Sequence, residues 1–375
     1  MICQPEKMAQ GGRAIARIEG KITFITGALP GETVEIEYLR HKKDFDEARV
    51  VRVLEAHAER VEPRCAHYGK CGGCNLQHAS ISLQRTLKSQ VVTDLFARMA
   101  KIKLETPVTI HGGDPWQYRR RARLVLGRKG WGFREDSGHE VEPIKKCPVL
   151  CEALQQDLSR LPTLQRDSEI QCFAGTDGVV GRWNKDDART AVPVQRVTLA
   201  GLDYAADARV FFQSNFELAS LLLERVQADL LAHRGQGIFA VDLFSGVGVF
   251  AKLMLGQFEK VVAVEWNPGC LAHARHNLEG RAEFISSDAE AYLLNQKTAA
   301  IDYLVVDPPR TGLSAETRKA LLQSKPKRIA YVSCDPVTLA RDVGEFVRNG
   351  WTLQLLEGYD FYPQTDHLEM LAVLV

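Results

Sequence analysis

The chain has no uninterrupted apolar run of about 18 residues, the length that a membrane-spanning helix needs, so we expect no membrane span. Its first residues show no basic segment followed by an apolar stretch, and we expect no secretory signal. The net charge of the 375 residues is only +1, so any nucleic-acid binding must come from local basic surfaces. We find no internal repeat and no low-complexity tract. What remains is the pattern of an ordinary globular protein.

The nine cysteines occur without an export signal, which favours metal binding or catalysis over a disulfide framework. We therefore expect a reducing, cytoplasmic compartment. A chain of 375 residues is too long for one compact core and predicts two or three domains. The motifs divide it into residues 1–57, 58–205 and 206–375.

The first region reads as short strands separated by glycine and proline turns, at residues 14–18, 21–25, 33–38 and 48–54. Strands this short in fewer than 60 residues predict a small barrel of the OB type, which often binds nucleic acid. A purely structural barrel is an equally good interpretation at this point.

The central region contains an amphipathic helix at residues 82–100, followed by an unusual basic segment. Residues 119–134 include seven basic residues and no acid, with Tyr118, Trp131 and Phe133 interleaved. Cations for phosphates and aromatic faces for unstacked bases are the components of single-stranded nucleic-acid binding. Taken alone, the segment is also compatible with a solvated hairpin face.

The last region alternates helices and strands and predicts a doubly wound parallel sheet. We expect helices at 217–232, 249–256 and 268–278. We expect strands at 237–242, 260–265, 282–285, 301–306, 328–332 and 368–374.

A glycine loop follows the first strand of this sheet. Gly246, Gly248 and Ala251 satisfy the dinucleotide-binding pattern, with Glu265 where a ribose-binding acid belongs, so the loop alone does not identify the cofactor. Asp242, directly before the loop, is typical of S-adenosylmethionine (SAM)-dependent methyltransferases. Asp307 precedes paired prolines at a strand end, a rigid turn that can hold a polar group towards a planar base. Together they favour SAM over a nicotinamide cofactor.

Cys334 lies between a predicted strand and a predicted helix, where an open α/β sheet places its ligand crevice. A helix N-terminus beyond it lowers a thiol pKa and favours the nucleophilic thiolate. On this segment alone, a structural cysteine is as good an interpretation.

A second group of cysteines has the spacing of a metal centre. Cys65, Cys71 and Cys74 are close in sequence, and Cys147 is followed by proline. Zinc and an iron–sulfur cluster both accept four cysteines, but grouping three plus one favours iron–sulfur. Cys151 is a rival fourth ligand.

These motifs resemble the RNA 5-methyluridine methyltransferases, the TrmA/RlmC/RlmD group, over nearly the whole chain. The segments that recur in family order are Phe211-Phe212-Gln213-Ser214-Asn215, Asp242-Leu243-Phe244-Ser245-Gly246, Asp307-Pro308-Pro309-Arg310, Ser333-Cys334-Asp335-Pro336 and His367-Leu368-Glu369. The residues that the resemblance assigns to SAM contact are Gln213, Phe244, Glu265, Asp307 and, with looser support, Asp288. It makes Cys334 the nucleophile at uracil C6 and Glu369 the base that removes the C5 proton. Val249 departs from the polar residue that many members have after the second glycine.

The resemblance implies an α/β protein with a C-terminal Rossmann-like SAM-dependent methyltransferase domain, an OB-like barrel and a mixed α+β central domain. Residues 11–17 and 27–32 resemble the TRAM domain, and the cysteine spacing resembles the 4Fe-4S site of the ribosomal-RNA members, with Cys147 as the fourth ligand. This layout matches the RlmD-like branch, which implies a 23S rRNA substrate. The uridine must be single-stranded or flipped out. We expect a monomer.

Two alternatives stay open. One is a methyltransferase that acts on tRNA or on two rRNA sites. The other is a non-catalytic RNA-binding iron–sulfur protein on a methyltransferase scaffold.

Overall fold

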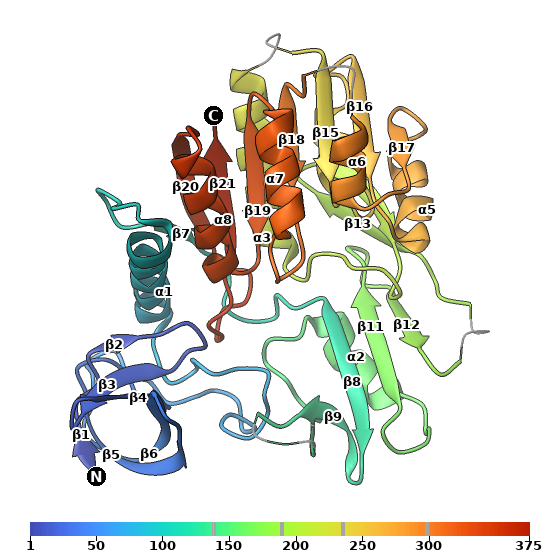
Figure 1. Ribbon diagram of the computed structural model, residues 1–375. Coiled ribbons are helices and arrows are strands. Elements are labelled where there is room, and N and C mark those ends of the chain that lie inside the picture. The colour runs from blue at the N-terminus through green and yellow to red at the C-terminus, as the bar shows by residue number, and fades with distance from the viewer. Residues whose placement is uncertain (137, 139, 188–190, 234–236, 297–299) are drawn as a thin grey trace.

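The computed structural model describes residues 1–136, 138, 140–187, 191–233, 237–296 and 300–375. Three bodies of secondary structure are visible in Figure 1: a curled sheet near the N-terminus, a central sheet, and a large sheet covered by helices that contains the C-terminus. In the described part of the chain, no helix is both long enough and apolar enough to cross a membrane.

The N-terminal body is a six-stranded sheet in the order β1-β5-β6-β4-β3-β2. Its strands are β1 (Ile2–Cys3), β2 (Lys7–Met8), β3 (Ala14–Ile18), β4 (Lys21–Thr26), β5 (Thr33–His41) and β6 (Phe45–Glu55). Figure 1 shows them curling into a ring around a small apolar core. The predicted barrel is therefore present, with longer strands than the sequence pattern indicated.

The central body is built on a five-stranded antiparallel sheet with the order β10-β9-β8-β11-β12. These strands are β8 (Arg121–Gly127), β9 (Gly130–Arg134), β10 (Val141–Pro143), β11 (Glu169–Ala174) and β12 (Val180–Asn184). The short helix α2 (Glu152–Asp157), extended by the 3₁₀ turn η2 (Leu158–Arg160), packs on it. A hairpin of β13 (Gln195–Leu199) and β14 (Leu202–Ala206) leads into the C-terminal body.

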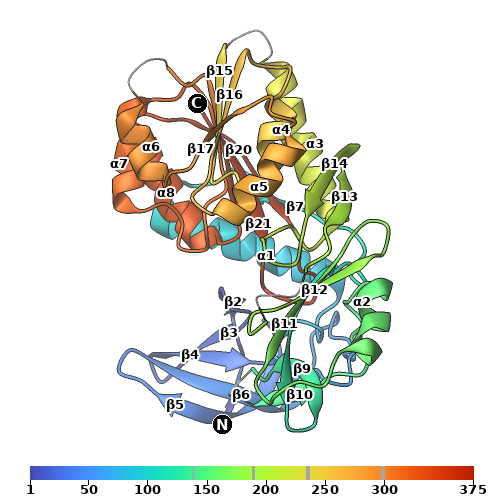
Figure 2. The same cartoon turned by 90° about the vertical axis from the view of Figure 1, so that its right-hand side faces the viewer.

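The C-terminal body is an eight-stranded sheet with the order β17-β16-β15-β18-β19-β21-β20-β7. Its strands are β7 (Thr109–His111), β15 (Phe239–Leu243), β16 (Lys260–Val264), β17 (Glu283–Ile285), β18 (Tyr303–Val306), β19 (Ile329–Ser333), β20 (Leu353–Tyr359) and β21 (Glu369–Leu374). Its helices are α3 (Phe216–Ala232), α4 (Val249–Met254), α5 (Pro268–Asn277), α6 (Ala289–Asn295), α7 (Ala315–Ser324) and α8 (Pro336–Arg348). Seen edge-on in Figure 2, the sheet has α3, α4 and α5 on one face and α6, α7 and α8 on the other.

The strand pairing corrects one expectation. The first five strands of this region, β15 to β19, run parallel as predicted, but β21 is antiparallel to both β19 and β20. The strand β20 and the edge strand β7 were not predicted, because β20 carries polar residues and β7 has only three residues. The sheet is therefore doubly wound with an antiparallel insertion.

Two segments from 58–205 pack against the C-terminal sheet. Helix α1 (Ile81–Leu95) and the π-helical turn η1 (Phe96–Ala100) share a hydrophobic core with α8, and β7 forms the edge of the sheet. A Cβ on Gly344 in α8 would lie only 2.6 Å from the Cα of Ala100, so a glycine is needed for this close approach. The division of the chain at residues 57 and 205 stays a prediction.

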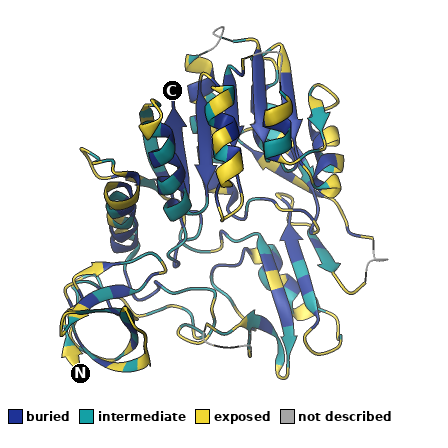
Figure 3. Ribbon diagram, in the orientation of Figure 1, coloured by how far each residue is buried: buried dark blue, intermediate teal, exposed yellow. Residues whose placement is uncertain are grey.

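The central strands of the sheet are buried on both faces, as Figure 3 shows by their continuous dark blue. This is the reason that they appear in the sequence as continuous apolar runs rather than alternating patterns. The polar residues that end these strands therefore stand at the rim of a rigid hydrophobic layer.

A buried ion pair fastens α3 to this sheet. The Arg328 guanidinium donates to both carboxylate oxygens of Asp229, with Nε to Oδ2 at 2.7 Å. The hydroxyl of Tyr303 donates to the same Oδ2 at 2.7 Å. Arg328 and Asp229 are 8% and 7% exposed, so neither charge has water as an alternative partner.

We predict that Arg328→Leu lowers the free energy of unfolding by about 3–5 kcal/mol, because it leaves the carboxylate of Asp229 buried without its cation. Urea denaturation followed by circular dichroism measures this. The matched control is Lys260→Met, which breaks a half-exposed pair with Glu283 and should cost less than about 1 kcal/mol. Equal costs in the two variants would contradict the buried-pair account.

Candidate active site

The site is built where the strand order of the sheet reverses, between β15 and β18. Neighbouring parallel strands end at the same edge there, and an open α/β sheet binds its ligand in that crevice. The residues that follow these strand ends are Phe244 after β15, Glu265 after β16, Asp307 after β18 and Cys334 after β19. Four residues that are up to 90 positions apart in sequence therefore lie at one edge.

Glu369 reaches the same edge from the opposite chain direction. It is the first residue of β21, which runs antiparallel to β19, and Ser333 is paired with Met370. Cys334 and Glu369 are each one residue beyond this pair, on the same side of it. The antiparallel insertion of β21 therefore places the predicted base beside the predicted nucleophile.

A pocket of about 450 Å³ opens at this edge. The predicted site residues that line it are Gln213, Phe244, Glu265, Asp307, Cys334 and Glu369. Its other walls are mostly apolar and include Leu222 of α3 and Phe250 of α4, together with residues of the glycine loop. The structure thus brings six of the seven residues assigned to catalysis and SAM contact into one cavity.

The glycine loop is held by its own hydrogen bonds. Asp242 accepts a hydrogen bond from the backbone N–H of Ala251 at 2.7 Å, which ties the end of β15 to α4. Glu265 accepts from the N–H of Gly246 at 3.0 Å with one oxygen and from Asn267 with the other. Gly248 has a φ of +85°, and a Cβ there would lie 3.0 Å from Leu278. The loop needs these residues for its shape, whatever it binds.

Several polar atoms around the pocket are buried without a hydrogen-bond partner among the described residues. They are Oε1 of Gln213, Oδ1 of Asp242, Oγ of Ser245 and Oε1 of Glu369. Leaving buried polar groups unpaired is costly, so such atoms gather where a ligand supplies the missing partner. A cavity with apolar walls and unpaired oxygens fits a ligand that has both a nucleoside and a charged part.

Burial raises the pKa of three ionisable groups in the pocket, and neighbouring carboxyl groups add to the rise at two of them. Burial raises the pKa of Cys334 to about 12, and the carboxyl groups of Glu369 and Asp307 add to this rise, whereas Arg310 opposes it. Burial, followed by the charge of Asp307, raises the pKa of Glu369 well above its usual value. Burial also raises the pKa of Asp307, to about 7. Raised pKa values of this kind are typical of functional sites.

The expectation that a helix N-terminus lowers the pKa of Cys334 is wrong. Helix α8 does begin two residues later, with Pro336 in its first turn, and its N-cap residue is Asp335. The Asp335 carboxylate accepts hydrogen bonds from the N–H groups of Val337 and Thr338, which satisfies this helix end. Desolvation and acidic neighbours outweigh the helix end at the thiol.

Asp288 is the predicted site residue that the structure places elsewhere. It caps α6 by accepting from the N–H of Ala291 at 2.7 Å and lies at a neighbouring hollow. That hollow shares Phe244 and Pro309 with the main pocket. The cap alone explains an aspartate at this position, and its contact with SAM stays a prediction.

The pocket also contains residues to which the sequence assigned no role. Arg310, Phe211 and Trp266 line it, and Phe211 and Trp266 are 66% and 68% exposed. Each adjoins a predicted residue: Arg310 follows the paired prolines, Phe211 precedes Gln213 by two residues, and Trp266 follows Glu265. Sequence reasoning missed these residues because their distinguishing feature, a large aromatic side chain exposed at a pocket rim, cannot be read from a sequence.

The four predicted metal ligands lie together at a second cavity. Cys65, Cys71, Cys74 and Cys147 all line it, although they come from segments more than 70 residues apart. The loop of the first three is fastened to the end of β9, where the N–H of Gly72 donates to the carbonyl of Arg134 at 3.0 Å. Cys151, the rival ligand, is instead buried in the apolar core of the central body.

Four cysteines at one cavity are a donor set that both zinc and an iron–sulfur cluster accept. Among the described residues, no three His, Cys, Asp or Glu side chains are arranged to hold one metal ion. Around a single zinc, with sulfur at about 2.3 Å, thiolates must lie about 4 Å apart. A four-iron cluster binds each thiolate through a different iron, so its ligands surround a larger space. Burial raises the pKa of Cys147, and the backbone N–H groups of Val149 and Leu150 oppose this rise.

The basic segment is divided between the interior and the surface. Arg120 donates to the carbonyl of Gly175 and stacks on Phe216, while Arg121 donates to two carbonyls and stacks on Phe173. These arginines hold the central sheet to the C-terminal body. Arg128 and Lys129, in the turn between β8 and β9, are exposed.

Comparisons with known proteins agree with this geometry. Residues 293–375 match the family model described as tRNA (Uracil-5-)-methyltransferase. The chain is 32% identical to a 23S rRNA (uracil(1939)-C(5))-methyltransferase RlmD of Azoarcus sp. (strain BH72), over 98% of both chains. It is also 32% identical to the protein of that name from Shewanella amazonensis, over 96% of this chain and 92% of the other.

A solved structure shares the fold over the full length of both chains. It is the Pyrococcus abyssi tRNA (uracil-54, C5)-methyltransferase in complex with S-adenosyl-L-homocysteine, with a TM-score of 0.76 and 22% identity. This likeness confirms the methyltransferase fold. The identity and coverage of the bacterial relatives show that the chain belongs to the RNA (uracil-C5)-methyltransferase family.

Proposed function

We propose that this protein transfers a methyl group from S-adenosylmethionine to C5 of a uridine in 23S rRNA, through a covalent adduct with Cys334. The observation that carries the proposal is the pocket in which Cys334 and Glu369, from adjacent antiparallel strands, meet the glycine loop. A non-catalytic scaffold has no use for a thiol, a base and this loop at one crevice.

The methyl donor supplies an electrophilic methyl group on a sulfonium. Phe244 and Glu265 form the part of the pocket beside the glycine loop, where they would hold its nucleoside. The unpaired Oε1 of Gln213 is available to the charged part of the donor or to the uracil. Apolar walls exclude water from the methyl group.

Cys334 starts the reaction by adding its sulfur to C6 of the uracil. The S–C6 bond forms, and the electrons of the C5=C6 double bond shift towards O4 to give an enolate. The nucleophilic C5 then forms a bond to the methyl carbon, while the bond from methyl to the donor sulfur breaks. The thiol must lose its proton first, which its raised pKa opposes and the cation of Arg310 favours.

Glu369 ends the reaction by removing the proton from C5. The C5–H electrons restore the C5=C6 double bond, and Cys334 leaves as a thiolate. Burial, which raises the pKa of Glu369, makes its carboxylate a stronger base than an exposed glutamate. Asp307, whose pKa is raised to about 7, can orient the uracil as a donor or an acceptor.

The 23S rRNA substrate is proposed from the names of the relatives and from the layout of the chain. A hollow beside the cysteine loop is lined by Arg64, Lys129, Lys145 and Lys146, which supports phosphate binding there. The barrel at residues 1–57, proposed as a TRAM domain, would add contacts. A uridine reaches the pocket only if it is single-stranded or flipped out.

We also propose that Cys65, Cys71, Cys74 and Cys147 hold a 4Fe-4S cluster. Their common cavity and the three-plus-one grouping support it. The cluster would join the loop of residues 65–74 to the turn before α2 and so order the central body.

We propose that the protein acts as a monomer in the cytoplasm.

The raised pKa of Cys334 predicts a specific pH dependence. In the SAM-free protein, we expect the rate of Cys334 alkylation by iodoacetamide to rise about tenfold per pH unit from 7 to 10 without a plateau, because the thiol pKa is raised to about 12. Mass spectrometry of the Cys334 peptide measures the rate. A plateau below pH 9 would show that the thiol is not desolvated in this way.

The activity is tested in a strain that lacks the gene. Expression of this protein should restore 5-methyluridine to 23S rRNA and not to tRNA, whereas Cys334→Ala should lower methylation by at least about 10⁴-fold with SAM binding retained. Mapping of modified uridines in both RNAs measures the outcome. If 5-methyluridine is restored in tRNA alone, tRNA replaces 23S rRNA as the proposed substrate. Full activity of Cys334→Ala would remove Cys334 from the mechanism.

The metal centre is tested by elemental analysis of protein purified without oxygen. We expect about four irons per chain, with loss of iron in Cys147→Ser. Cys151→Ser is the matched control and should keep its iron, since Cys151 is buried in an apolar core rather than at the cavity. Stoichiometric zinc without iron would overturn the cluster.

A further inference from the structure

The segment at residues 360–368 connects β20 to β21 and ends at Glu369. It forms neither helix nor strand, so no ladder of backbone hydrogen bonds of its own holds it. Gln364 within it has a φ of +73°, a left-handed conformation that a non-glycine residue keeps only when its surroundings impose it. Glu369 pairs with Tyr359 of β20, and the contacts that hold this segment set how the chain enters that pairing.

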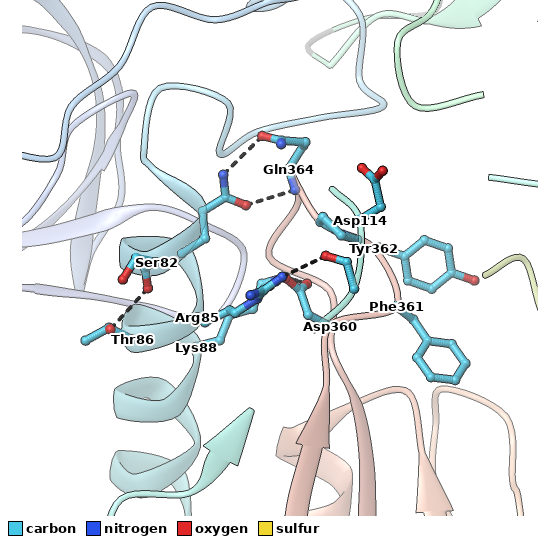
Figure 4. Close-up of polar contacts among 12 residues, drawn as sticks. Ser82, Arg85, Thr86, Lys88, Asp114, Asp360, Phe361, Tyr362 and Gln364 are labelled. Atoms are coloured by element: carbon cyan, nitrogen blue, oxygen red, sulfur yellow. Dashed lines mark hydrogen bonds and ion pairs between the residues drawn. The ribbon is translucent and has the colours of Figure 1, made fainter. Parts of the chain in front are cut away.

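One ammonium group of α1 holds both ends of the segment. Lys88 forms a buried ion pair with Asp360, its first residue, and donates to the carbonyl of His367 at 2.9 Å. His367 lies two residues before Glu369. Figure 4 shows Lys88 and Arg85 reaching from the helix towards Asp360. The side chains of Lys88 and Asp360 are only 4% and 0% exposed, so water does not compete for them.

A second residue of α1, Gln84, holds the middle of the segment at residues 360–368. Gln84 accepts from the N–H of Gln364 at 2.9 Å and donates to its side-chain oxygen at 3.0 Å, the paired bonds that Figure 4 shows at Gln364. The carbonyl of Gln364 accepts from the N–H groups of Asn75 and Leu76, directly after Cys74. Gln84 and Gln364 are 0% and 2% exposed.

The opposite side of the segment is held as well. Tyr118 donates its hydroxyl to the carbonyl of Pro363 at 3.0 Å, and Asn215 donates to the carbonyl of Phe361 at 3.2 Å. The side chains of Phe361 and Tyr362 point away from α1 in Figure 4. The segment is thus held from two sides, by α1 on one and by Tyr118 and Asn215 on the other.

We propose that Gln84 and Lys88 are positioning residues for proton abstraction, acting on Glu369 through Gln364 and Asp360. This rests on the proposed function, because it assigns them to the step in which Glu369 removes the C5 proton. Cys334 is carried by β19, which these contacts do not touch, so loss of the network should slow elimination while adduct formation continues. A misplacement of a catalytic group by about 1 Å is enough to lower a rate about 100-fold.

The experiment compares Gln84→Met with Glu369→Gln under turnover with SAM and the RNA substrate. Both should accumulate a methylated RNA–protein adduct, seen as a slow band on a denaturing gel, because Cys334 cannot leave until the C5 proton is removed. We expect kcat of Gln84→Met to fall about 10- to 100-fold with an unchanged affinity for SAM. Thr86→Ala is the matched control, since Thr86 is exposed on the same helix and bonds only within it. It should show neither effect.

A double variant, Lys88→Met with Asp360→Asn, removes both charges of the second contact together and tests the inference if Gln84→Met does not fold. Arg85, which also faces Asp360, keeps its hydrogen bond to the carbonyl of Gly113. If the Gln84 or Lys88–Asp360 variants have a lower melting temperature and lose SAM binding and adduct formation to the same extent, these contacts are only structural. That result would overturn the inference. If Glu369→Gln accumulates the adduct but neither Gln84→Met nor the double variant does, the inference is overturned, while the proposed role of Glu369 stands. If Glu369→Gln itself forms no adduct, the proposed role of Glu369 fails, and the inference fails with it.

Discussion

The antiparallel insertion of β21 between β19 and β20 is the constraint on which the site depends. In a wholly parallel sheet, every strand would begin at the edge opposite the crevice, and Glu369 would lie at the wrong end. Because β21 is reversed, its first residue stands beside the residue that follows β19. The proposed nucleophile and the proposed base therefore each adjoin one ladder pair, Ser333 with Met370.

The same arrangement has an electrostatic consequence. Three ionisable side chains, Asp307, Cys334 and Glu369, share a cavity whose walls are largely apolar, and desolvation raises the pKa of each of them. A resting site of this kind disfavours several negative charges at once. The nearby Arg310 opposes the rise at Cys334.

Most elements with strong patterns could be predicted from the sequence. The apolar runs of β15, β16, β18 and β19 are long enough to identify because both faces of these strands are buried. The edge strand β7 and its neighbour β20 were missed, because β7 has only three residues and β20 carries polar residues among its apolar ones. The direction of the pKa shift at Cys334 was predicted wrongly, because burial raises this pKa most and Glu369 and Asp307 add to the rise. Both burial and these neighbours arise only in the folded chain.

The sequence by itself determined the alternating α/β pattern, the glycine loop and the two groups of cysteines, because each of these is a local pattern of residue types. The roles of Cys334 and Glu369 stay predictions that rest on the family resemblance. Only the tertiary structure decided that β21 runs antiparallel, that Cys147 and not Cys151 joins the other three cysteines at one cavity, and that Arg120 and Arg121 are structural. It also brought α1 against the segment before Glu369, 280 residues further along the chain. Such contacts depend on how whole elements pack, and no local pattern encodes the distance between residues that packing brings together.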